Sequence, residues 1–460
     1  MRESMVLLVG GLLIVTACSP ASVPTSPGLA SPGSAASPAV ATPVQLSVWQ
    51  FGSPNTKRAD GVVWEEWWDS KIKEFTNQNP HITVSFAAKG QEAGGTTLAI
   101  DAALAAGSPP TIYFDVLFRQ AKYAASPGLL EPLDSVLSAA DWKAMNSGAV
   151  RTVTRSDGTR WGVPVMTTTP FLLAVNKTMA TAAGAANLLP AEPNRDWTTE
   201  QFVAFLKAVA KPPQTYGTVF YAKTPSFTEA LSGYAGGFGA VFYKDGDYCR
   251  SAIDSPAAVR WLEWTNDLIK QRLVMPGPAG LADQDMVAAW SNQQIAVAPG
   301  SQLQIDLSKR LVSEGKAKEL DVYLVNYPHE PGVAPPPPAQ NSPWAATLFK
   351  QTDPAKREAA VKFLKFLANE PTLTAYATGW GVISPFTAAA SRWAGDNSNY
   401  QFLLRMVEQR GVQDMGYSAN NFNLVRLAWA TARQKIWSGA VDPKQGLQQF
   451  AQEASKLLCP

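Results

Sequence analysis

“VQLSVWQFG” (44–52) begins the stretch of sequence that decides the fold. It opens with alternating apolar and polar residues and ends in a glycine, a pattern that predicts a strand followed by a turn. “VVWEEWWDSKIKEFTNQNP” (62–80) then places large apolar side chains at helical spacing and stops at a proline, which predicts a helix. “HITVSF” (81–86), “TTLAIDAALAAG” (96–107) and “PPTIYFDV” (109–116) follow as a predicted strand, helix and strand. This alternation is typical of an α/β domain with a mostly parallel sheet.

Helix-capping patterns extend the alternation toward the C-terminus. Thr198 and Gln201 have the spacing of a capping box, in which each side chain bonds the backbone of the other residue. Ser255 and Asp353 each precede a proline, and a capping side chain before a proline marks the first turn of a helix. We interpret “APPPPA” (334–339), a low-complexity patch within the domain, as an exposed loop.

Size and composition indicate a soluble globular protein with two lobes. About 415 residues follow position 43, which is too many for one ordinary core. The chain is 46% hydrophobic and 17% charged, and its formal net charge of +2 is not gathered in a basic block. This distribution argues against nucleic acid as a partner and against a helix that lies on a membrane surface.

The N-terminus has the features of an export signal. Residues 5–17 are about a dozen apolar or small residues, the size of a signal-peptide core rather than of a membrane span. “VTAC” (15–18) resembles a bacterial lipobox, so we expect a lipoprotein signal peptide at 1–17 and a lipid on Cys18. Residues 18–43 are almost entirely Ser, Pro, Ala, Thr and Gly, which predicts a Pro/Ser/Ala-rich tether. The alternative is an ordinary secretory signal that is cut at the same point or beyond it.

The cysteine count favours a disulfide. With Cys18 lipidated, the two remaining cysteines are Cys249 and Cys459. An even number of cysteines in an exported chain favours a bond between them. The alternative is two separately buried thiols.

Seven stretches of the sequence carry a family resemblance through their order. They are “KIKEFTNQNPHITVSF” (71–86), “AALAAGSPPTIYFDV” (102–116), “GLLEPLDSVL” (128–137), “DGTRWGVPVMTTTPFLLAVNKTM” (157–179), “DWTTEQFVAFLKAVA” (196–210), “AIDSPAAVRWLEWTNDLI” (252–269) and “DPAKREAAVKFLKFLANEPTLTAYATGWGVISP” (353–385). In this order they resemble the extracellular solute-binding proteins of ABC importers (family 1), the group similar to maltose- and oligosaccharide-binding proteins.

The resemblance implies the two-lobed periplasmic-binding-protein-like fold. Each lobe would be a mostly parallel sheet flanked by helices, and hinge strands would join the lobes, which close on a ligand between them. The N-lobe would comprise residues 44–165 and 344–395, and the C-lobe residues 166–343 and 396–460. Both remaining cysteines would then lie in the C-lobe.

The resemblance also implies a function. The chain would be the extracytoplasmic substrate-binding lipoprotein of an ABC import system, lipid-anchored to the cell membrane, which captures a sugar or oligosaccharide and delivers it to permease subunits. We expect a monomer with no nucleic-acid partner, no membrane contact beyond the lipid anchor and no cofactor. The alternatives are a lipid-anchored sensing or adhesion domain with the same fold, or a non-sugar solute such as a polyol or glycerol phosphate.

The sequence lacks the motifs that enzymes and metal sites need. His81 and His329 each stand beside a proline, and no H-E-x-x-H motif, CxxC pair or acidic calcium loop occurs. Neither a G-x-S-x-G elbow nor a phosphate-binding G-x-x-x-x-G-K-[ST] loop is present. We therefore expect no catalytic residue and no metal site, and so a binding protein rather than an enzyme.

Aromatic residues are abundant, with 15 Trp, 12 Tyr and 19 Phe. A sugar packs its C–H faces on aromatic rings, and its hydroxyls need amide, hydroxyl or carboxylate partners. We assign tryptophans at helical spacing, such as Trp64 and Trp261, to packing, and select residues that follow strands or lie in loops. The predicted ligand contacts are Trp49, Phe51, Asp115, Phe118, Thr167, Thr168, Gln302, Asn341, Trp344 and Trp380. Because only Arg119 is placed to meet an anion, the sequence favours a neutral sugar.

Overall fold

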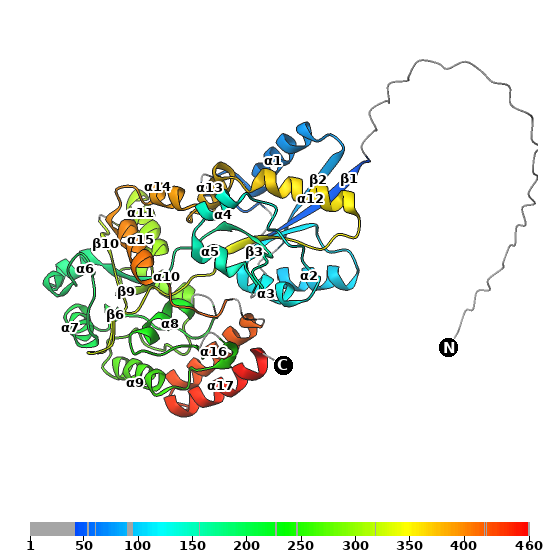
Figure 1. The fold of residues 1–460 in the computed structure, drawn as a ribbon. Helices are drawn as coiled ribbons and strands as arrows, with labels where there is room; N and C mark the ends of the chain where they lie inside the picture. Colours follow the sequence, from blue (N-terminus) through cyan, green and yellow to red (C-terminus); the bar gives the residue numbers. More distant parts are fainter. Residues whose placement is uncertain are drawn as a thin grey trace, which may run out of the picture. The chain divides into compact units, whose positions relative to one another are not determined.

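The computed structural model describes residues 42–458 except 53–54, 60, 90–94, 156, 226–227, 245–246, 318, 418 and 420. The predicted signal peptide, most of the predicted tether, Cys18 and Cys459 lie outside the described residues. The chain from Pro43 onward forms one compact unit, and Figure 1 labels its α-helices and several of its strands. Among the described helices, none is both long and apolar enough to span a lipid bilayer.

Five strands form the sheet of the N-lobe. Their spatial order is β2 (Ile82–Lys89), β1 (Val44–Phe51), β3 (Ile112–Val116), β11 (Trp344–Leu348) and β4 (Val163–Met166). β1 pairs in parallel with β2 and β3, whereas β11 runs antiparallel to both of its neighbours. The helices of this lobe are α1 (Trp64–Gln78), α2 (Gly95–Ala105), α3 (Leu117–Ala125), α4 (Ala139–Ala144), α5 (Ser147–Thr152), α12 (Pro354–Leu367) and α13 (Glu370–Gly379).

Four strands form the sheet of the C-lobe, in the order β10 (Val322–Val325), β5 (Leu172–Asn176), β9 (Ile295–Gly300) and β6 (Tyr216–Thr218). β5 runs antiparallel to β10 and β9, and β9 pairs in parallel with β6. Every residue of β5 and β9 is buried, as expected for strands covered on both faces. The remaining elements of this lobe are α6 (Lys177–Ala182), η1 (Ala186–Leu188), α7 (Thr199–Val209), α8 (Thr228–Gly236), β7 (Tyr243–Lys244), β8 (Asp247–Ser251), α9 (Pro256–Lys270), α10 (Asp283–Ser291), α11 (Gln302–Ser313), α15 (Ser398–Arg410), α16 (Phe422–Trp437) and α17 (Pro443–Leu458). α14 (Thr387–Ala394) contributes Ala389 to the buried core of the N-lobe and Ala394 to that of the C-lobe, so it borders both lobes.

One strand of each sheet runs against the others, and in each case the chain has just crossed from the other lobe. β5 follows the crossing at 167–171, and β11 follows the crossing at 326–343. Two parallel strands that are directly connected need a crossover over the same sheet, whereas β5 and β11 enter their sheets from the other lobe. The predicted fold of two α/β lobes joined by hinge strands is therefore confirmed, and the antiparallel pairs mark the crossings. The exact residues at which the lobes divide stay a prediction.

The predicted capping patterns are present. The side chains of Thr198 and Gln201 form a capping box at the start of α7. The side chains of Ser255 and Asp353 accept hydrogen bonds from the first turns of α9 and α12, each with a proline at the helix start. These local signals fixed the helix starts correctly because they depend only on neighbouring residues.

Residues 334–339 form a loop, as predicted, but the expectation that this loop is exposed is wrong for half of it. Pro336, Pro338 and Ala339 are buried in the second crossing between the lobes, whereas Ala334 is exposed. The carbonyl of Pro338 accepts from the backbone N–H of Gln413 at 2.8 Å. Proline favours an extended chain and carries no N–H that burial would leave unpaired, so a proline run suits a buried crossing as well as a surface loop.

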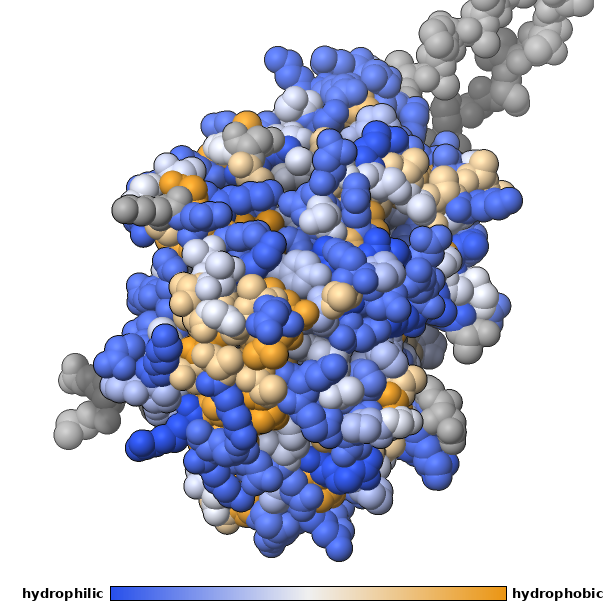
Figure 2. All heavy atoms as spheres, turned by 90° about the vertical axis from the view of Figure 1, so that its left-hand side faces the viewer, coloured by the Kyte–Doolittle hydropathy of each residue, from blue (hydrophilic) through white to orange (hydrophobic). Residues whose placement is uncertain are grey.

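Apolar packing is continuous between the lobes. One cluster of buried side chains lies wholly within residues 44–166 and 344–389 and forms the core of the N-lobe. The other cluster contains the core of the C-lobe and also side chains of α2 and α3, such as Ile100 and Leu117. α3 therefore belongs to the N-lobe but packs with the C-lobe core. On the outside, the face of the molecule in Figure 2 is mostly hydrophilic, with a cluster of hydrophobic residues near its middle.

Candidate functional site

Three of the predicted aromatic residues come together at one edge of the N-lobe sheet. The ring centroids of Phe51 and Trp344 are 5.7 Å apart, and those of Trp344 and Trp380 are 4.9 Å apart. Phe51 ends β1, whereas Trp344 begins the reversed strand β11, so both lie at the same edge. Trp380 directly follows α13, and its ring stacks on that of Trp64 at 5.0 Å. We call Trp64, Trp380, Trp344 and Phe51 the aromatic row.

The members of the aromatic row differ in exposure. Trp64 is 1% exposed and Trp344 is 6% exposed, whereas Trp380 and Phe51 are half-buried. The residue before Trp380 must be small, because a Cβ at Gly379 would lie 3.0 Å from the Trp64 ring. Trp380 is therefore the tryptophan of the row that can offer part of its ring to a ligand, and Trp344 supports it from the core.

Arg119 lies against the end of the aromatic row. Its guanidinium is 3.9 Å from the ring centroid of Phe51, and its Nη1 donates to Asp115 Oδ1 at 2.8 Å. The Asp115 carboxylate also accepts from the backbone N–H of Val116 at 2.6 Å and from the hydroxyl of Tyr113. Asp115 has no exposed surface, and burial raises its pKa although the adjacent guanidinium opposes the rise. The prediction that Asp115 contacts the ligand directly needs correction, because the buried carboxylate instead orients Arg119.

A polar cluster from the C-lobe lies beside Trp380. Nε2 of Gln302 is 3.8 Å from the position that a Cβ would take at Gly381, the residue after Trp380. This Nε2 donates to Asp306 Oδ2 at 3.1 Å, and the hydroxyl of Tyr400 donates to Asp306 Oδ1 at 3.0 Å. Oε1 of Gln302 is buried without a hydrogen-bond partner among the described residues. The cluster therefore offers amide and carboxylate oxygens close to Gly381, the residue that follows Trp380.

The carboxylate of Asp306 is partly shielded from water. The residue as a whole is exposed, yet burial of its carboxyl group raises the pKa of Asp306, while the hydrogen bond from Tyr400 acts in the opposite direction. Two of the carboxylate's acceptor positions are occupied by Gln302 and Tyr400, and an ionised carboxylate has about four. Asp306 can therefore accept further hydrogen bonds from a ligand.

Sequence reasoning missed Asp306 and Tyr400. Asp306 lies four residues after Gln302 on α11, so the helical repeat was a signal that could have found it. Tyr400 belongs to α15, and its ring stacks on that of Trp393 at 4.1 Å. No local pattern links α15 to α11, so only the folded chain brings Tyr400 to this cluster.

The predicted contacts in the crossing segments hold the crossings together. The hydroxyl of Thr167 donates to the carbonyl of Ile383 at 3.3 Å, and the hydroxyl of Thr168 donates to the carbonyl of Ser342 at 2.8 Å. Nδ2 of Asn341 donates to a carbonyl of the first crossing at 3.2 Å. These bonds give Thr167, Thr168 and Asn341 a structural role in the hinge, and their contact with a ligand stays a prediction.

Trp49 and Phe118 lie apart from the aromatic row. The ring of Trp49 lies 4.1 Å from Nζ of Lys89 and packs on the larger core cluster. The ring of Phe118 lies 6.0 Å from each of the rings of Tyr417 and Phe422, both in the C-lobe. Phe118 therefore bridges the two lobes.

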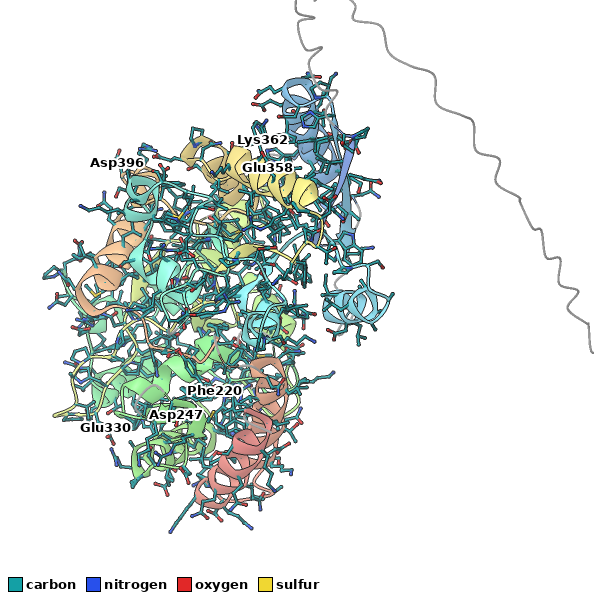
Figure 3. The ribbon with its side chains drawn as sticks, turned by 45° about the vertical axis from the view of Figure 1, so that its right-hand side comes forward. Phe220, Asp247, Glu330, Glu358, Lys362 and Asp396 are labelled. Carbon is teal, nitrogen blue, oxygen red and sulfur yellow. The ribbon has the colours of Figure 1, made fainter. Side chains whose placement is uncertain are left out.

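Cys249 lies on β8 and is disulfide-bonded. Its backbone N–H donates at 2.9 Å to the side chain of Asp247, which is labelled in Figure 3. The predicted partner, Cys459, lies outside the described residues, next to the end of α17 in the sequence. α17 packs against β8, so the proposed pairing agrees with the element that precedes Cys459.

Two surface cavities lie away from the aromatic row. One of about 340 Å³ is lined by Asp134, Trp142 and Arg160 among others, and one of about 390 Å³ lies between α16 and α17. Neither cavity is lined by a predicted ligand contact. Among the residues that the structure describes, no three His, Cys, Asp or Glu side chains gather as a metal site would require.

Comparison with known families gives one match that covers more than half of the chain. Residues 61–372 match the family described as bacterial extracellular solute-binding protein. No curated protein matches the sequence at a significant level.

Solved structures share the fold at low sequence identity. An ABC transporter solute-binding protein from Thermotoga lettingae, bound with α-D-tagatose, is 21% identical with a TM-score of 0.68 and covers 90% of this chain and 100% of its own. The GacH receptor of Streptomyces glaucescens, solved unliganded and with acarbose, is 16% identical with a TM-score of 0.68 and covers 91% and 99%. Maltose-bound MalE3 of T. maritima is 19% identical with a TM-score of 0.67 and covers 90% and 100%. At these identities the likeness shows the fold alone.

Proposed function

Since this chain belongs to the bacterial extracellular solute-binding protein family, we propose that it captures a sugar or short oligosaccharide between its two lobes and delivers it to the permease of an ABC import system. The observation that carries the proposal is the aromatic row of the N-lobe with the Gln302–Asp306 pair of the C-lobe beside it. A ligand held between them would contact both lobes.

The chemistry of this arrangement fits a saccharide. The half-buried ring of Trp380 can stack against the C–H face of a pyranose or furanose ring. The carboxylate of Asp306 and the unpartnered Oε1 of Gln302 can accept hydrogen bonds from sugar hydroxyls. An apolar platform with a few convergent polar groups is the usual form of a small-molecule site.

The charges near the aromatic row favour a neutral ligand. Arg119 is already paired with Asp115 at 2.8 Å, so an anionic solute would have to compete with this carboxylate for the guanidinium. Arg58, whose guanidinium lies 4.9 Å from the ring centroid of Trp64, is buried and donates to the carbonyl of Ala375 at 3.3 Å. In its ionised form the carboxylate of Asp306 would also repel an anion.

The related structures support a sugar. The three described above were solved with α-D-tagatose, with acarbose and with maltose. All three ligands present hydroxyls around a compact carbon frame, and such a ligand suits an aromatic platform beside amide and carboxylate acceptors.

We also propose that the protein acts as a lipid-anchored monomer on the outer side of the membrane. Cys18 would carry the lipid, and residues 18–43 would act as a spacer of roughly 3 Å per residue when extended. A disulfide between Cys249 and Cys459 would tie β8 to the end of the chain. The lobes would divide at the residues predicted from the sequence and close about the hinge when a ligand binds.

A thermal-shift screen of the purified chain against neutral sugars, including tagatose, maltose and acarbose, tests the proposal. A ligand at 100 times its dissociation constant stabilises the folded state by about 2.7 kcal/mol, which is a measurable rise in melting temperature. We expect a rise with at least one neutral sugar. A panel in which only anionic or non-sugar solutes raise the melting temperature would contradict the proposal.

A further inference from the structure

Phe118 of the N-lobe lies in an aromatic cage built by the C-lobe. Its ring is 6.0 Å from that of Tyr417 at an interplanar angle of 26°, and 6.0 Å from that of Phe422 at 60°. The guanidinium of Arg426 lies 4.8 Å from the ring centroid of Phe118. We call Tyr417, Phe422 and Arg426 the cage. Phe118 is distant in sequence from the three cage residues, so this contact joins the two lobes.

The C-lobe holds the cage in place by itself. Tyr417 and Phe422 are 2% and 4% exposed, and their rings are 4.8 Å apart. Nε of Arg426 lies 2.5 Å from Glu229 Oε1, and its Nη2 donates to the carbonyl of Pro225 at 2.9 Å. Glu229 is itself only 3% exposed. Because every member of the cage has partners within the C-lobe, the cage needs no ligand to form.

The N-lobe presents Phe118 on a fixed support. Leu117, the first residue of α3, donates its backbone N–H to the carbonyl of Pro343 in the second crossing at 2.9 Å. Arg119, the residue after Phe118, is held by the buried carboxylate of Asp115. Phe118 is therefore fixed to the hinge end of the N-lobe and moves with it when the lobes open.

We propose that Phe118 and the cage form a latch that holds the two lobes together before any solute binds. A contact that breaks when the lobes open shifts the population from open toward closed. Packing between the aromatic rings and the attraction between the Arg426 guanidinium and the Phe118 ring stabilise this contact, and neither needs a ligand. Because less of the ligand's binding free energy is then needed to close the lobes, the latch raises the affinity for any solute held between them. The latch does not depend on the solute being a sugar.

Three substitutions separate a latch from ordinary packing. Phe118→Ala removes the ring that enters the cage, and Phe118→Tyr retains it. Phe366→Ala is the matched control, because Phe366 is also a half-buried phenylalanine of the N-lobe. Its ring neighbours are Phe75 at 5.4 Å and Phe363 at 6.3 Å, both within the N-lobe. All three substitutions alter an N-lobe aromatic residue, and only Phe118→Ala breaks a contact between the lobes.

The test measures the ligand-free full chain by small-angle X-ray scattering and by hydrogen exchange of peptides that cover α3 and α16. The N-terminal residues are the same in every variant, so differences in radius of gyration report on the lobes. We expect Phe118→Ala to enlarge the radius of gyration and to speed exchange of both peptides several-fold. Phe118→Tyr and Phe366→Ala should match the parent protein in both measurements.

Two results would overturn the latch. An unchanged radius of gyration and unchanged exchange in Phe118→Ala would show that the cage does not hold the lobes. An equal expansion in Phe366→Ala would show that loss of any N-lobe ring loosens the molecule. If Phe118→Ala does not fold, Phe118→Leu keeps the apolar volume without the ring. Expansion of that variant supports the latch, and an unchanged radius rules it out.

Discussion

Replacing Trp380 with alanine is expected to weaken sugar binding while both lobes stay folded. The ring of Trp380 is half-buried, and its neighbours in the aromatic row are Trp64 at 5.0 Å and Trp344 at 4.9 Å. By analogy with other stacking contacts, loss of the ring removes about 1–3 kcal/mol of binding free energy. This corresponds to roughly a 5- to 150-fold rise in the dissociation constant.

Trp344→Ala is the contrasting variant. Trp344 is 6% exposed and begins a central strand, so its removal leaves a cavity in the N-lobe core. Truncation of a buried tryptophan costs about 3–5 kcal/mol of folding free energy. The half-buried Trp380 should lose clearly less, because part of its ring already faces solvent.

Two measurements on both variants separate these free energies. Calorimetric titration with the tightest-binding sugar gives the free energy of binding, and urea unfolding gives the free energy of folding. We expect the affinity loss to be the main effect in Trp380→Ala and the stability loss to be the main effect in Trp344→Ala. Unchanged affinity in Trp380→Ala, with the protein folded, would refute the assignment of this ring as the stacking platform.

Five further outcomes are expected. Asp306→Asn should weaken sugar binding by about 1.5–3 kcal/mol, the range for a hydrogen bond to a charged group. Equal affinity of the variant and the parent protein by calorimetry would show that Asp306 does not bind the sugar. Burial raises the pKa of Asp306, and only the ionised carboxylate is a full acceptor, so affinity in the parent protein should fall as the pH drops through that raised pKa. A titration of Asp306→Asn should lack this fall. Cys18→Ser should release the protein from membrane fractions or block its processing, and a normally processed, membrane-bound variant would rule out the lipid anchor. Intact mass after alkylation without reductant should show Cys249 and Cys459 unmodified; two alkylated thiols would end the pairing proposal. Deletion of residues 19–43 should leave affinity unchanged, and a tenfold loss would show that the tether contributes to binding.

The order of strands and helices in the N-lobe could be predicted because each signal is local. The alternation in β1, the apolar spacing in α1 and the glycine after α2 depend on neighbouring residues only. The reversal of β5 and β11 could not be predicted in this way, since it follows from the path of the chain between lobes. The proline run at 334–339 misled for the same reason, because its burial depends on segments distant in sequence.

The candidate site was predictable in part. Phe51, Trp344 and Trp380 were selected for their place after strands or in loops, and the fold brings these three together. Asp115 follows the same rule, but its carboxylate is turned inward to Tyr113 and Arg119, and side-chain direction at a strand end is not encoded in spacing.

The partners of Phe118 could not be predicted from the sequence either. Tyr417, Phe422 and Arg426 come from the last part of the chain, and no local pattern in that part points to α3. Contacts between lobes require the fold as a whole, and this is why the latch emerges only from the structure.

A crystal structure of the protein with a bound neutral sugar tests the central claim most directly. We predict one sugar ring packed on Trp380, with hydroxyls that donate to Asp306 and Gln302 and with both lobes in contact with the ligand. Electron density for the sugar at either surface cavity, or at any place that only one lobe contacts, would contradict the account.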